Sequence, residues 1–287
     1  MNTNLVIQGT EVTNADLRQL AKLSSAYRIE AIAGVTGAEQ AFRLLGADPA
    51  SAAAVAAHCE PVELDFGFVP QARKPGDFGL AVMDMDSTLI TIECIDEIAD
   101  LMGLKAPVAA ITAAAMRGEI DFGESLRRRV CLLAGLPLSA LDRVYRERLK
   151  LSPGTEAMLA GFKIAGVKTL LVSGGFSFFA DRLAALLGLD FCAANTLAIV
   201  DGKLTGEVLG ELVDADAKAS WLVKIRDQLG LSTGQVIGIG DGANDLKMLA
   251  AAGISIAYRA KPVVRSQANY ALNFTGLAGV LHLLAGS

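Results

Sequence analysis

The sequence predicts an α/β protein whose core is a doubly wound, Rossmann-like parallel sheet with helices on both faces. Apolar, strand-like runs alternate with helical patterns from Phe78 onward, and these runs are Leu80–Met83, Val167–Val172, Val236–Ile239 and Ile254–Ala257. Each of the first three runs leads into a turn that is rich in Asp or Gly. Because ligands of such sheets bind at the carboxyl ends of the strands, we expect the functional site at these turns.

A small α+β domain is expected to precede this core, over residues 1–75. Its pattern follows the order strand, helix, strand, strand, helix, strand, which is typical of ferredoxin-like folds. The expected elements are Leu5–Gln8, a helix that Asn14 caps and that runs to Ala26, Arg28–Ala33, Ala41–Leu45, a helix over Pro49–His58, and Val62–Val69. The arrangement resembles the ACT-type amino-acid-sensing modules, which implies a sensor. A packing appendage, or a surface through which a homodimer forms, fits the same pattern.

A helical insert is expected to interrupt the core directly after its first strand. The polar segment Gln71–Asp77 contains Pro75 and Gly76 and suits a linker between the two domains. No convincing strand pattern follows between Glu93 and Lys150, where we expect the helices Ile95–Met102, Val108–Met116, Glu124–Leu133 and Ser139–Leu149. The core is therefore expected over residues 76–92 and 151–287, with residues 93–150 inserted as a helical cap.

Two further elements are expected in the core. Asp201-Gly202, between the runs Leu197–Val200 and Lys203–Val208, is a typical β-hairpin turn. The uncharged stretch from Ser266 to Ser287 contains Gln, Asn and His side chains, so it predicts a terminal strand and helix rather than a membrane span.

Composition excludes several classes of protein. Of the 287 residues, 52% are hydrophobic and 20% are charged, which is enough apolar material for a full core and argues against disorder. The formal net charge of −5 argues against broad electrostatic capture of nucleic acid. The first thirty residues lack the order of a signal peptide, so we expect a cytoplasmic protein without a membrane partner. In that reducing compartment the cysteines are expected as free, buried thiols; they are Cys59, Cys94, Cys131 and Cys192.

The strongest local motif is Asp84-Met85-Asp86-Ser87-Thr88, directly after the strand-like run Leu80–Met83. Residues two apart on an extended chain project to the same side, so both carboxylates are expected at the end of the strand. Each then disfavours ionisation of the other unless a cation lies between them, and Mg²⁺ is the natural choice. The alternative is a pair of aspartates that caps the following helix. With only two histidines in the chain, we expect carboxylates to carry the chemistry.

Three further elements favour a phosphate ligand. Ser173-Gly174-Gly175 follows a strand-like run, and its hydroxyl and backbone N–H groups suit phosphate oxygens. Lys218 stands at the start of a predicted helix and would supply a fixed positive charge, although a lone lysine of this kind is more often a solvated surface residue. The segment Gly240–Asp245 places more carboxylates after the strand-like run Val236–Ile239, and its glycines allow close approach to a ligand.

In this order the four elements resemble the haloacid-dehalogenase-like phosphatase superfamily, over a match from Phe78 to the C-terminus. The resemblance implies that Asp84 is the nucleophile that forms an aspartyl-phosphate. It implies that Asp86 is the general acid that protonates the leaving alcohol and then the base that activates water.

The same resemblance implies the remaining groups of the phosphate and metal sites. Ser173, Gly174 and Lys218 would bind the phosphoryl group. Mg²⁺ would be held by the Asp84 carboxylate, the Asp86 backbone carbonyl and Asp241. Asn244 and Asp245 would support that site from nearby, with Asn244 also on the substrate side.

The expected cap resembles that of the phosphoserine phosphatases within this superfamily, in the runs Glu93–Ala99 and Asp121–Val130. The resemblance implies that O-phospho-L-serine is the substrate and that its hydrolysis is the last step of serine biosynthesis. Glu93 would bind the ammonium group, Arg129 the carboxylate, and Met116 and Phe122 would shield the pocket. A guanidinium suits a carboxylate because it pairs with it through two parallel hydrogen bonds.

Two alternatives use the same residues. A phosphotransferase would form the same aspartyl-phosphate but pass the phosphoryl group to another alcohol, such as homoserine. A regulatory amino-acid-binding protein would keep the fold with an inactive core, and the complete set of Asp84, Asp86, Ser173, Lys218 and Asp241 argues against it.

Overall fold

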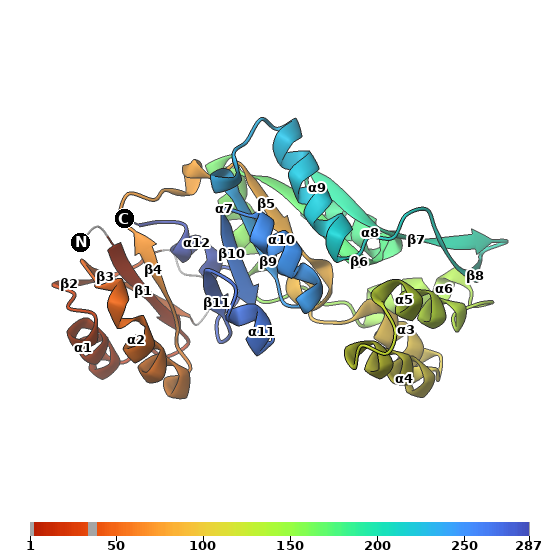
Figure 1. Cartoon of the computed structure of the whole chain (residues 1–287), viewed down its shortest axis with the longest axis horizontal. Coiled ribbons are helices and arrows are strands. Elements are labelled where there is room, and N and C mark those ends of the chain that lie inside the picture. The colour runs from red at the N-terminus through yellow and green to blue at the C-terminus, as the bar shows by residue number, and fades with distance from the viewer. Residues whose placement is uncertain (1–2, 34–38, 287) are drawn as a thin grey trace.

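A computed structural model of the chain, which describes residues 3–33 and 39–286, contains two separate sheets (Figure 1). The first sheet has four strands in the order β2-β3-β1-β4, and the second has seven in the order β11-β10-β9-β5-β6-β7-β8. The small sheet lies at one end of the molecule, and a group of helices lies at the other end (Figure 1). The predicted α/β core with a small α+β domain before it is confirmed.

The N-terminal sheet has the strand order of a ferredoxin-like fold, with every neighbouring pair antiparallel. Its elements are β1 (Thr3–Gly9), α1 (Asn14–Leu23), β2 (Arg28–Ala31), β3 (Gln40–Leu45), α2 (Ala52–Cys59) and β4 (Asp65–Pro70). The helices pack their apolar side chains on one face of the sheet, where Leu20 and Val55 meet Leu5, Ile7 and Leu44. Each such fully buried side chain stabilises the fold by about 1.5–3 kcal/mol.

Some of the predicted boundaries in this domain were wrong for local reasons. Thr13, not Asn14, caps α1: its hydroxyl accepts a hydrogen bond from the Asp16 N–H at 3.1 Å, and the Asp16 side chain accepts one from the Thr13 N–H. The helix ends at Leu23 rather than Ala26, because Ser25 takes a positive φ of 57°.

Strands β2 and β4 are both shorter than predicted. Strand β2 ends at Ala31 instead of Ala33. Strand β4 begins at Asp65 instead of Val62, because residues Glu60–Val62 form a 3₁₀ turn and Glu63 has a left-handed backbone with φ 55°.

The seven-stranded sheet is parallel except for its edge strand β8, which pairs antiparallel with β7. Its strands are β5 (Leu80–Met83), β6 (Lys168–Phe176), β7 (Phe191–Val200), β8 (Lys203–Leu209), β9 (Val236–Gly240), β10 (Ile254–Tyr258) and β11 (Tyr270–Leu272). The chain runs outward from β5 through β6, β7 and β8, and then returns to the other side of β5 at β9. This reversal places a topological switch point between β5 and β9, where ligands of such sheets bind.

Helices cover both faces of this sheet, which confirms the doubly wound prediction. Leu80 and Val82 point to the face covered by α9 (Ala215–Gln228), α10 (Leu246–Ala251) and α11 (Pro262–Arg265). Ala81 and Met83 alternate with them and point to the face covered by α7 (Thr155–Ala165), α8 (Ser177–Leu187) and α12 (Gly279–Leu283). The expected terminal strand and helix after Ser266 are β11 and α12.

The structure confirms the predicted hairpin of the core but not the predicted turn at Ser173-Gly174-Gly175. The hairpin is confirmed: Asp201 and Gly202 have φ of 49° and 72°, as the two central residues of a tight type I′ turn require. The turn expected at Ser173-Gly174-Gly175 is instead part of β6, which runs to Phe176 with an irregular register against β7. The glycines therefore lie in an irregular stretch of strand at its carboxyl end.

Four helices follow β5, as predicted: α3 (Cys94–Leu101), α4 (Lys105–Met116), α5 (Phe122–Cys131) and α6 (Leu138–Glu147). Helix α6 begins at Leu138 with Pro137 before it, so the predicted start at Ser139 was wrong. The loop before α6 is bound to the β7–β8 hairpin: Gly135 N–H donates to Leu204 at 2.8 Å and Leu138 N–H to Gly202 at 2.9 Å. The domain boundaries near residues 75, 92 and 150 stay predictions.

Two other expectations concern the whole chain. None of the described helices is long and apolar enough to cross a membrane. All four cysteines are free, and Cys59 and Cys94 are buried as expected. The expectation of a buried thiol was wrong for Cys131, which is exposed at the end of α5, and Cys192 is only half-buried.

One buried carboxylate joins the two sheets. Asp65, at the start of β4, accepts hydrogen bonds from the N–H groups of Asn273, Phe274 and Thr275 at 2.7, 3.1 and 2.8 Å. It also accepts one from the Thr275 hydroxyl at 2.7 Å. A single side chain of the N-terminal domain thus satisfies the backbone of the loop that follows β11 in the core.

We expect Asp65→Ala to lower the free energy of unfolding by about 2–4 kcal/mol, because several backbone donors lose their only charged acceptor. Urea denaturation followed by circular dichroism measures this change. Asp227, whose side chain is 60% exposed, offers a matched control, and Asp227→Ala should shift stability by no more than about 0.5 kcal/mol. Equal effects of the two substitutions would contradict the role given to Asp65.

Candidate active site

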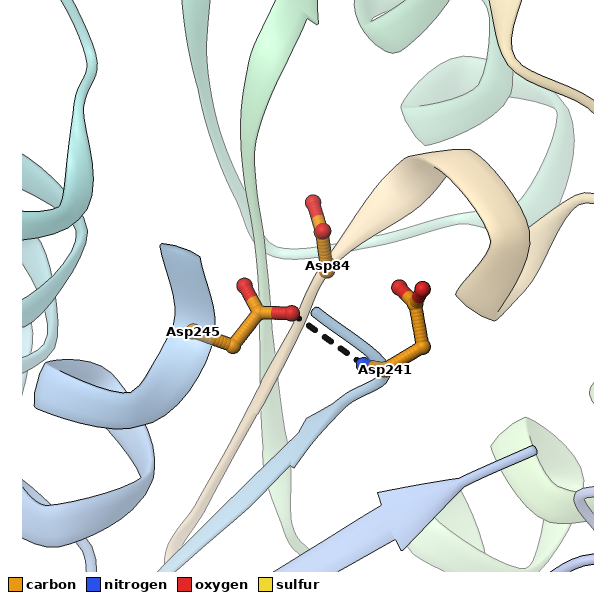
Figure 2. A group of neighbouring side chains, drawn as sticks. All are labelled: Asp84, Asp241 and Asp245. Atoms are coloured by element: carbon orange, nitrogen blue, oxygen red, sulfur yellow. Dashed lines mark hydrogen bonds between the residues drawn. The ribbon is translucent and has the colours of Figure 1, made fainter. Parts of the chain in front are cut away.

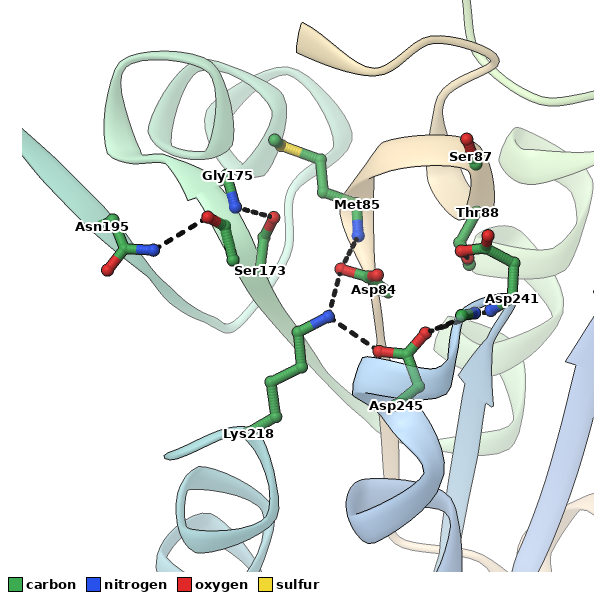
Figure 3. A network of polar contacts seen from close by, with 12 residues as sticks. Asp84, Met85, Ser87, Thr88, Ser173, Gly175, Asn195, Lys218, Asp241 and Asp245 are labelled. Atoms are coloured by element: carbon green, nitrogen blue, oxygen red, sulfur yellow. Dashed lines mark hydrogen bonds and ion pairs between the residues drawn. The ribbon is translucent and has the colours of Figure 1, made fainter. Parts of the chain in front are cut away.

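The predicted site residues gather around one cavity of about 330 Å³ between the carboxyl ends of β5, β6 and β9 and the helices α3, α4 and α5. Ten of the twelve line it directly: Asp84, Asp86, Glu93, Met116, Phe122, Arg129, Ser173, Gly174, Asp241 and Asn244. The other two, Lys218 and Asp245, are buried beneath it and contact Asp84 or Asp241 (Figure 3). The topology therefore brings together residues that are up to 161 positions apart, from Asp84 to Asp245.

Asp84 ends strand β5, where its N–H donates to the Ile239 carbonyl of β9 at 3.0 Å. Its carboxylate accepts a hydrogen bond from the Met85 N–H at 2.7 Å, so it also caps the tight turn Met85–Leu89. Inside that turn Ser87 takes a positive φ of 55°. Of the two interpretations of the motif, the structure shows capping by Asp84, and the ligand pair stays a prediction.

Asp86 lies in the same turn, and its carboxylate accepts a hydrogen bond from the Cys94 N–H at 3.3 Å, at the start of α3. Asp84 and Asp86 both line the cavity, as expected. The charge that raises the pKa of each most belongs to a residue outside the pair. Burial and then the Asp245 charge raise the pKa of Asp84 well above its usual range. Burial and then the Glu93 charge raise the pKa of Asp86 to about 7. A carboxyl group with this pKa can both give and take a proton near neutral pH.

Lys218 connects two of the carboxylates (Figure 3). Its Nζ lies 2.8 Å from Asp84 Oδ1 and 2.7 Å from Asp245 Oδ1, and the side chain is 1% exposed. Asp214 caps α9 and so sets Lys218 in the first turn of that helix. Burial disfavours the charged lysine, but the two carboxylates outweigh it and hold the pKa of Lys218 above its usual range. The lysine is therefore a fixed cation, not a solvated surface residue.

Both carboxylate oxygens of Asp245 have partners within the protein. Its Oδ1 is paired with Lys218, and its Oδ2 accepts the N–H groups of Asp241 and Gly242 at 3.1 and 3.0 Å (Figures 2 and 3). A Cβ at Gly240 would lie 2.5 Å from Asp245 Oδ2, so this close approach requires glycine. Asp245 thus holds the Asp241 loop and the lysine in place.

The carboxylates of Asp84, Asp241 and Asp245 each place an oxygen within 4.8 Å of the others (Figure 2). Asp241 Oδ1 accepts the Thr88 hydroxyl at 3.1 Å, and the second oxygens of Asp84 and Asp241 have no hydrogen-bond partner in the described parts of the chain. Burial and the Asp245 charge raise the pKa of Asp241 to about 6. Several carboxylates face one lysine here, and this excess of negative oxygen donors suits a hard divalent cation.

Two hydrogen bonds fix the backbone of the Ser173-Gly174-Gly175 segment. The buried Ser173 hydroxyl accepts the Gly175 N–H at 2.9 Å, and Asn195 Nδ2 donates to the Gly174 carbonyl at 2.8 Å. A Cβ at Gly175 would lie 2.7 Å from Asp86 Oδ2, so only glycine fits beside that carboxylate.

Sequence analysis missed Asn195 and Thr88, although the sequence carried a signal for one of them. Asn195 is a polar residue in an apolar strand, β7, and its Oδ1 also accepts the Val213 N–H at 2.8 Å. It thereby connects the Gly174 backbone with the loop that precedes α9. Thr88 belongs to the recognised motif, but nothing in the sequence pairs it with Asp241.

Glu93 and Arg129 also line the cavity. The Ser87 hydroxyl donates to Glu93 Oε1 at 2.7 Å, and burial raises the pKa of Glu93. Arg129 Nε donates to the Ser125 carbonyl at 3.3 Å, and burial lowers the pKa of Arg129 against the opposing charges of Asp96 and Glu93. Two opposite charges thus line the same cavity, with Glu93 directly before α3 and Arg129 on α5.

Only the last of three consecutive arginines lines this cavity. Arg128 is exposed and pairs with Glu124 at 2.6 Å, one helical turn away. Arg127 lines a different groove, beside Glu211 and Asp214. An α-helix turns by about 100° per residue, so three consecutive side chains on it cannot all point into one pocket.

The aromatic ring of Phe122 lies against the Ser173-Gly174-Gly175 segment, 3.1 Å from where a Cβ on Gly174 would be. The helices therefore touch the core and close the cavity on that side. Met116 is 72% exposed and contributes only part of its side chain. Further lining residues had no distinguishing signal in the sequence; they are Ile95, Asp96, Thr112, Leu126, Phe176 and Lys261.

Comparison with protein-family models gives two matches. The haloacid dehalogenase-like hydrolase model matches residues 78–253, from β5 through α10, which includes the four helices after β5. A domain of unknown function (DUF4072) matches residues 5–55 in the N-terminal domain.

Known relatives agree with the first match. A phosphoserine phosphatase of a Polaromonas species is 50% identical over 234 residues, which covers 78% of this chain and 99% of the relative. The crystal structure of a probable phosphoserine phosphatase from Vibrio cholerae superposes with a TM-score of 0.85 at 38% identity, over 99% of this chain and 86% of the other.

A third relative is a phosphoserine phosphatase whose structure was solved as an analogue of the phospho-aspartyl intermediate. It has a TM-score of 0.68 and 38% identity, over 72% of this chain and 99% of the other. The family match also favours an enzyme over a regulatory protein with an inactive core. The chain belongs to the haloacid dehalogenase-like hydrolases and, within them, to the phosphoserine phosphatases.

Proposed function

We propose that the protein is a Mg²⁺-dependent enzyme that hydrolyses O-phospho-L-serine to L-serine and phosphate through an aspartyl-phosphate. The observation that carries this proposal is the cavity itself. Its lining combines Asp84 and the Ser173-Gly174-Gly175 segment with the opposite charges of Glu93 and Arg129. A phosphorylated zwitterion is complementary to this combination of groups.

The amino-acid end of the substrate is recognised by charge. The Glu93 carboxylate would bind the ammonium group, and the Arg129 guanidinium would bind the carboxylate through two parallel hydrogen bonds. The Ser87 hydroxyl fixes Glu93, while Arg129 makes one hydrogen bond of its own through Nε. Phe122 and Met116 would shield this end from water, which strengthens both charge pairs.

The first half-reaction transfers the phosphoryl group to the protein. An oxygen of Asp84 forms a bond to phosphorus while the bond from phosphorus to the serine oxygen breaks. Asp86 gives its proton to that oxygen, so serine leaves as a neutral alcohol. Lys218 offsets the repulsion between the phosphate dianion and the Asp84 carboxylate, and Ser173 with the Gly174 backbone would bind the equatorial oxygens.

The second half-reaction returns Asp84 to its starting state. Asp86, now a carboxylate, takes a proton from water; the water oxygen bonds to phosphorus and the bond to Asp84 breaks. The pKa of Asp86, about 7, supports both of its roles, because neither protonation state of this carboxyl group is strongly disfavoured near neutral pH. The similarity to the phosphatase solved as a phospho-aspartyl analogue supports this two-step course.

Mg²⁺ would be held by Asp84, Asp241 and the Asp86 backbone carbonyl, with Asn244 and Asp245 supporting the site. When bound, it would neutralise charge on the transferring phosphoryl group. The fully paired carboxylate of Asp245 supports a role beside the metal rather than on it.

The same assignment implies a place in metabolism and in the cell. Hydrolysis of O-phospho-L-serine would be the step that releases serine in its biosynthesis. Free thiols, of which Cys131 is exposed, suit a reducing compartment, so we place the activity in the cytoplasm.

The proposal is tested by phosphate release from O-phospho-L-serine and a panel of other phosphate esters, with Mg²⁺ or with EDTA. We expect Mg²⁺-dependent turnover that favours O-phospho-L-serine and is abolished in a folded Asp84→Asn variant. Turnover by that variant would contradict the nucleophile. Phosphoryl transfer only to an added alcohol such as homoserine would favour a phosphotransferase instead.

The assignment of Arg129 is tested by a difference between substrates. We expect Arg129→Ala to reduce kcat/KM for O-phospho-L-serine by about a hundredfold, the loss of a charge-assisted pair, and to leave an aryl phosphate within about threefold. Arg128→Ala is the matched control, because Arg128 is its exposed neighbour on α5 and should change neither substrate. Equal losses on both substrates would rule out a carboxylate-binding role.

Metal binding is tested by the pH dependence of stability. The folded pKa values of Asp241 and Asp86, about 6 and about 7, lie above their unfolded values, so the folded state binds more protons between pH 4 and 7. Without metal, stability should therefore fall as pH rises through this range. Mg²⁺ would compete with the proton on the Asp241 carboxylate, so we expect it to raise the melting temperature more at pH 8 than at pH 5. An equal or opposite difference in thermal melts with Mg²⁺ and EDTA would contradict the assignment.

A further inference from the structure

Lys261 is a second lysine at the active-site cavity, and no step of the proposed reaction uses it. It lies in the loop that joins β10 to α11, and β10 is the neighbour of β9 in the sheet (Figure 1). The Lys261 N–H donates to the Asp241 carbonyl, with the nitrogen and the oxygen 3.4 Å apart. The fold thus places this lysine beside the loop that carries Asp241.

The backbone of Lys261 is fixed on both sides. Its carbonyl accepts the N–H groups of Val264 and Arg265 in α11 at 2.9 and 3.1 Å. On the other side, Ala260 is buried in the core. The position of Lys261 is therefore set by the fold, while the residue itself is exposed to solvent where it lines the cavity.

Negative charge dominates the lining of this cavity. Lys218, beneath it, is paired with two carboxylates, and Arg129 is the cation assigned to the carboxylate of the substrate. Within residues 3–33 and 39–286, the Lys261 side chain has neither an ion pair nor a hydrogen bond. Its charge is therefore available to a ligand. Five carboxylates line the cavity around it; they are Asp84, Asp86, Glu93, Asp96 and Asp241.

An anionic substrate has to approach these carboxylates. A phosphate monoester carries close to two negative charges near neutral pH. A fixed positive charge on a cleft raises the local concentration of such a ligand and its rate of association. This attraction acts through solvent over about 10 Å at 0.1 M salt, so it requires no contact between Lys261 Nζ and the phosphate.

We propose that Lys261 is a capture residue, whose charge attracts the phosphoryl group of the substrate into the cavity on the side of Asp241. This inference rests on the proposed function and adds a preference for doubly charged phosphate esters, whatever their alcohol. The charge acts alike on the bound substrate and on the transition state, because the phosphoryl group stays negative throughout the transfer. It should therefore change KM and leave kcat unaltered.

Steady-state kinetics at two ionic strengths test the proposal, with O-phospho-L-serine and an aryl phosphate as substrates. At about 10 mM ionic strength we expect Lys261→Gln to raise KM for both esters by about fivefold, with kcat within about twofold. At about 0.5 M, where charges are screened within a few ångströms, the difference in KM should vanish. Lys261→Arg keeps the charge and should behave as the wild type does.

Lys247→Gln is the matched control. It makes the same change in net charge at an exposed lysine that is paired with Asp216 and does not line the cavity. It should change neither KM nor kcat at either ionic strength.

Inorganic phosphate separates this inference from the reaction itself. Calorimetric titration of phosphate into the full chain with Mg²⁺ needs no turnover. Lys261→Gln should weaken this binding by about fivefold at low ionic strength, and Arg129→Ala should leave it unchanged.

Four results would each overturn the role of Lys261: a loss that persists at high salt, a loss in kcat, a loss confined to O-phospho-L-serine, or phosphate binding equal to that of the wild type. Absence of turnover by the wild type, with the expected difference in phosphate binding, would refute the proposed function and leave the role of Lys261 supported.

Discussion

The active site depends on one interaction, the pairing of the buried Lys218 ammonium group with the Asp84 and Asp245 carboxylates. It joins three elements that are distant in sequence: the end of β5, the first turn of α9 and the loop after β9. Removing one partner would leave a buried charge uncompensated, which is strongly destabilising. In the proposed reaction the same group would offset repulsion between Asp84 and a phosphate. One lysine thus organises the end of the sheet and would also make attack on an anion feasible.

The surrounding charges are unbalanced, and this imbalance suits the proposed ligands. Asp84, Asp86, Glu93 and Asp241 all have raised pKa values, because burial and mutual repulsion disfavour their charged forms. A divalent cation would relieve the repulsion between Asp84 and Asp241, and a substrate ammonium would relieve that between Glu93 and Asp86. The site is therefore arranged for ligands that bring positive charge to both of its ends.

Local patterns predicted much of the fold and of the site, because each pattern has one physical cause. Leu80–Met83 forms a buried strand as an uninterrupted apolar run, and Asp201-Gly202 forms a hairpin turn because both positions tolerate positive φ. Features that depend on tertiary packing were missed or misjudged. Gly174 and Gly175 lie in an irregular strand rather than a turn, because β7 continues beside them through Asn195. The partners of Asp86 and Asp241 come from other elements, and no spacing in the chain reveals them.

The covalent step at Asp84 is the central claim of this account, and it has a direct test. A reaction with O-phospho-L-serine and Mg²⁺ is quenched in acid, digested and analysed by mass spectrometry. The account predicts a phosphoryl adduct on Asp84 that appears in the first turnover and disappears as substrate is exhausted. Serine release without any adduct, or an adduct on a residue other than Asp84, would contradict it.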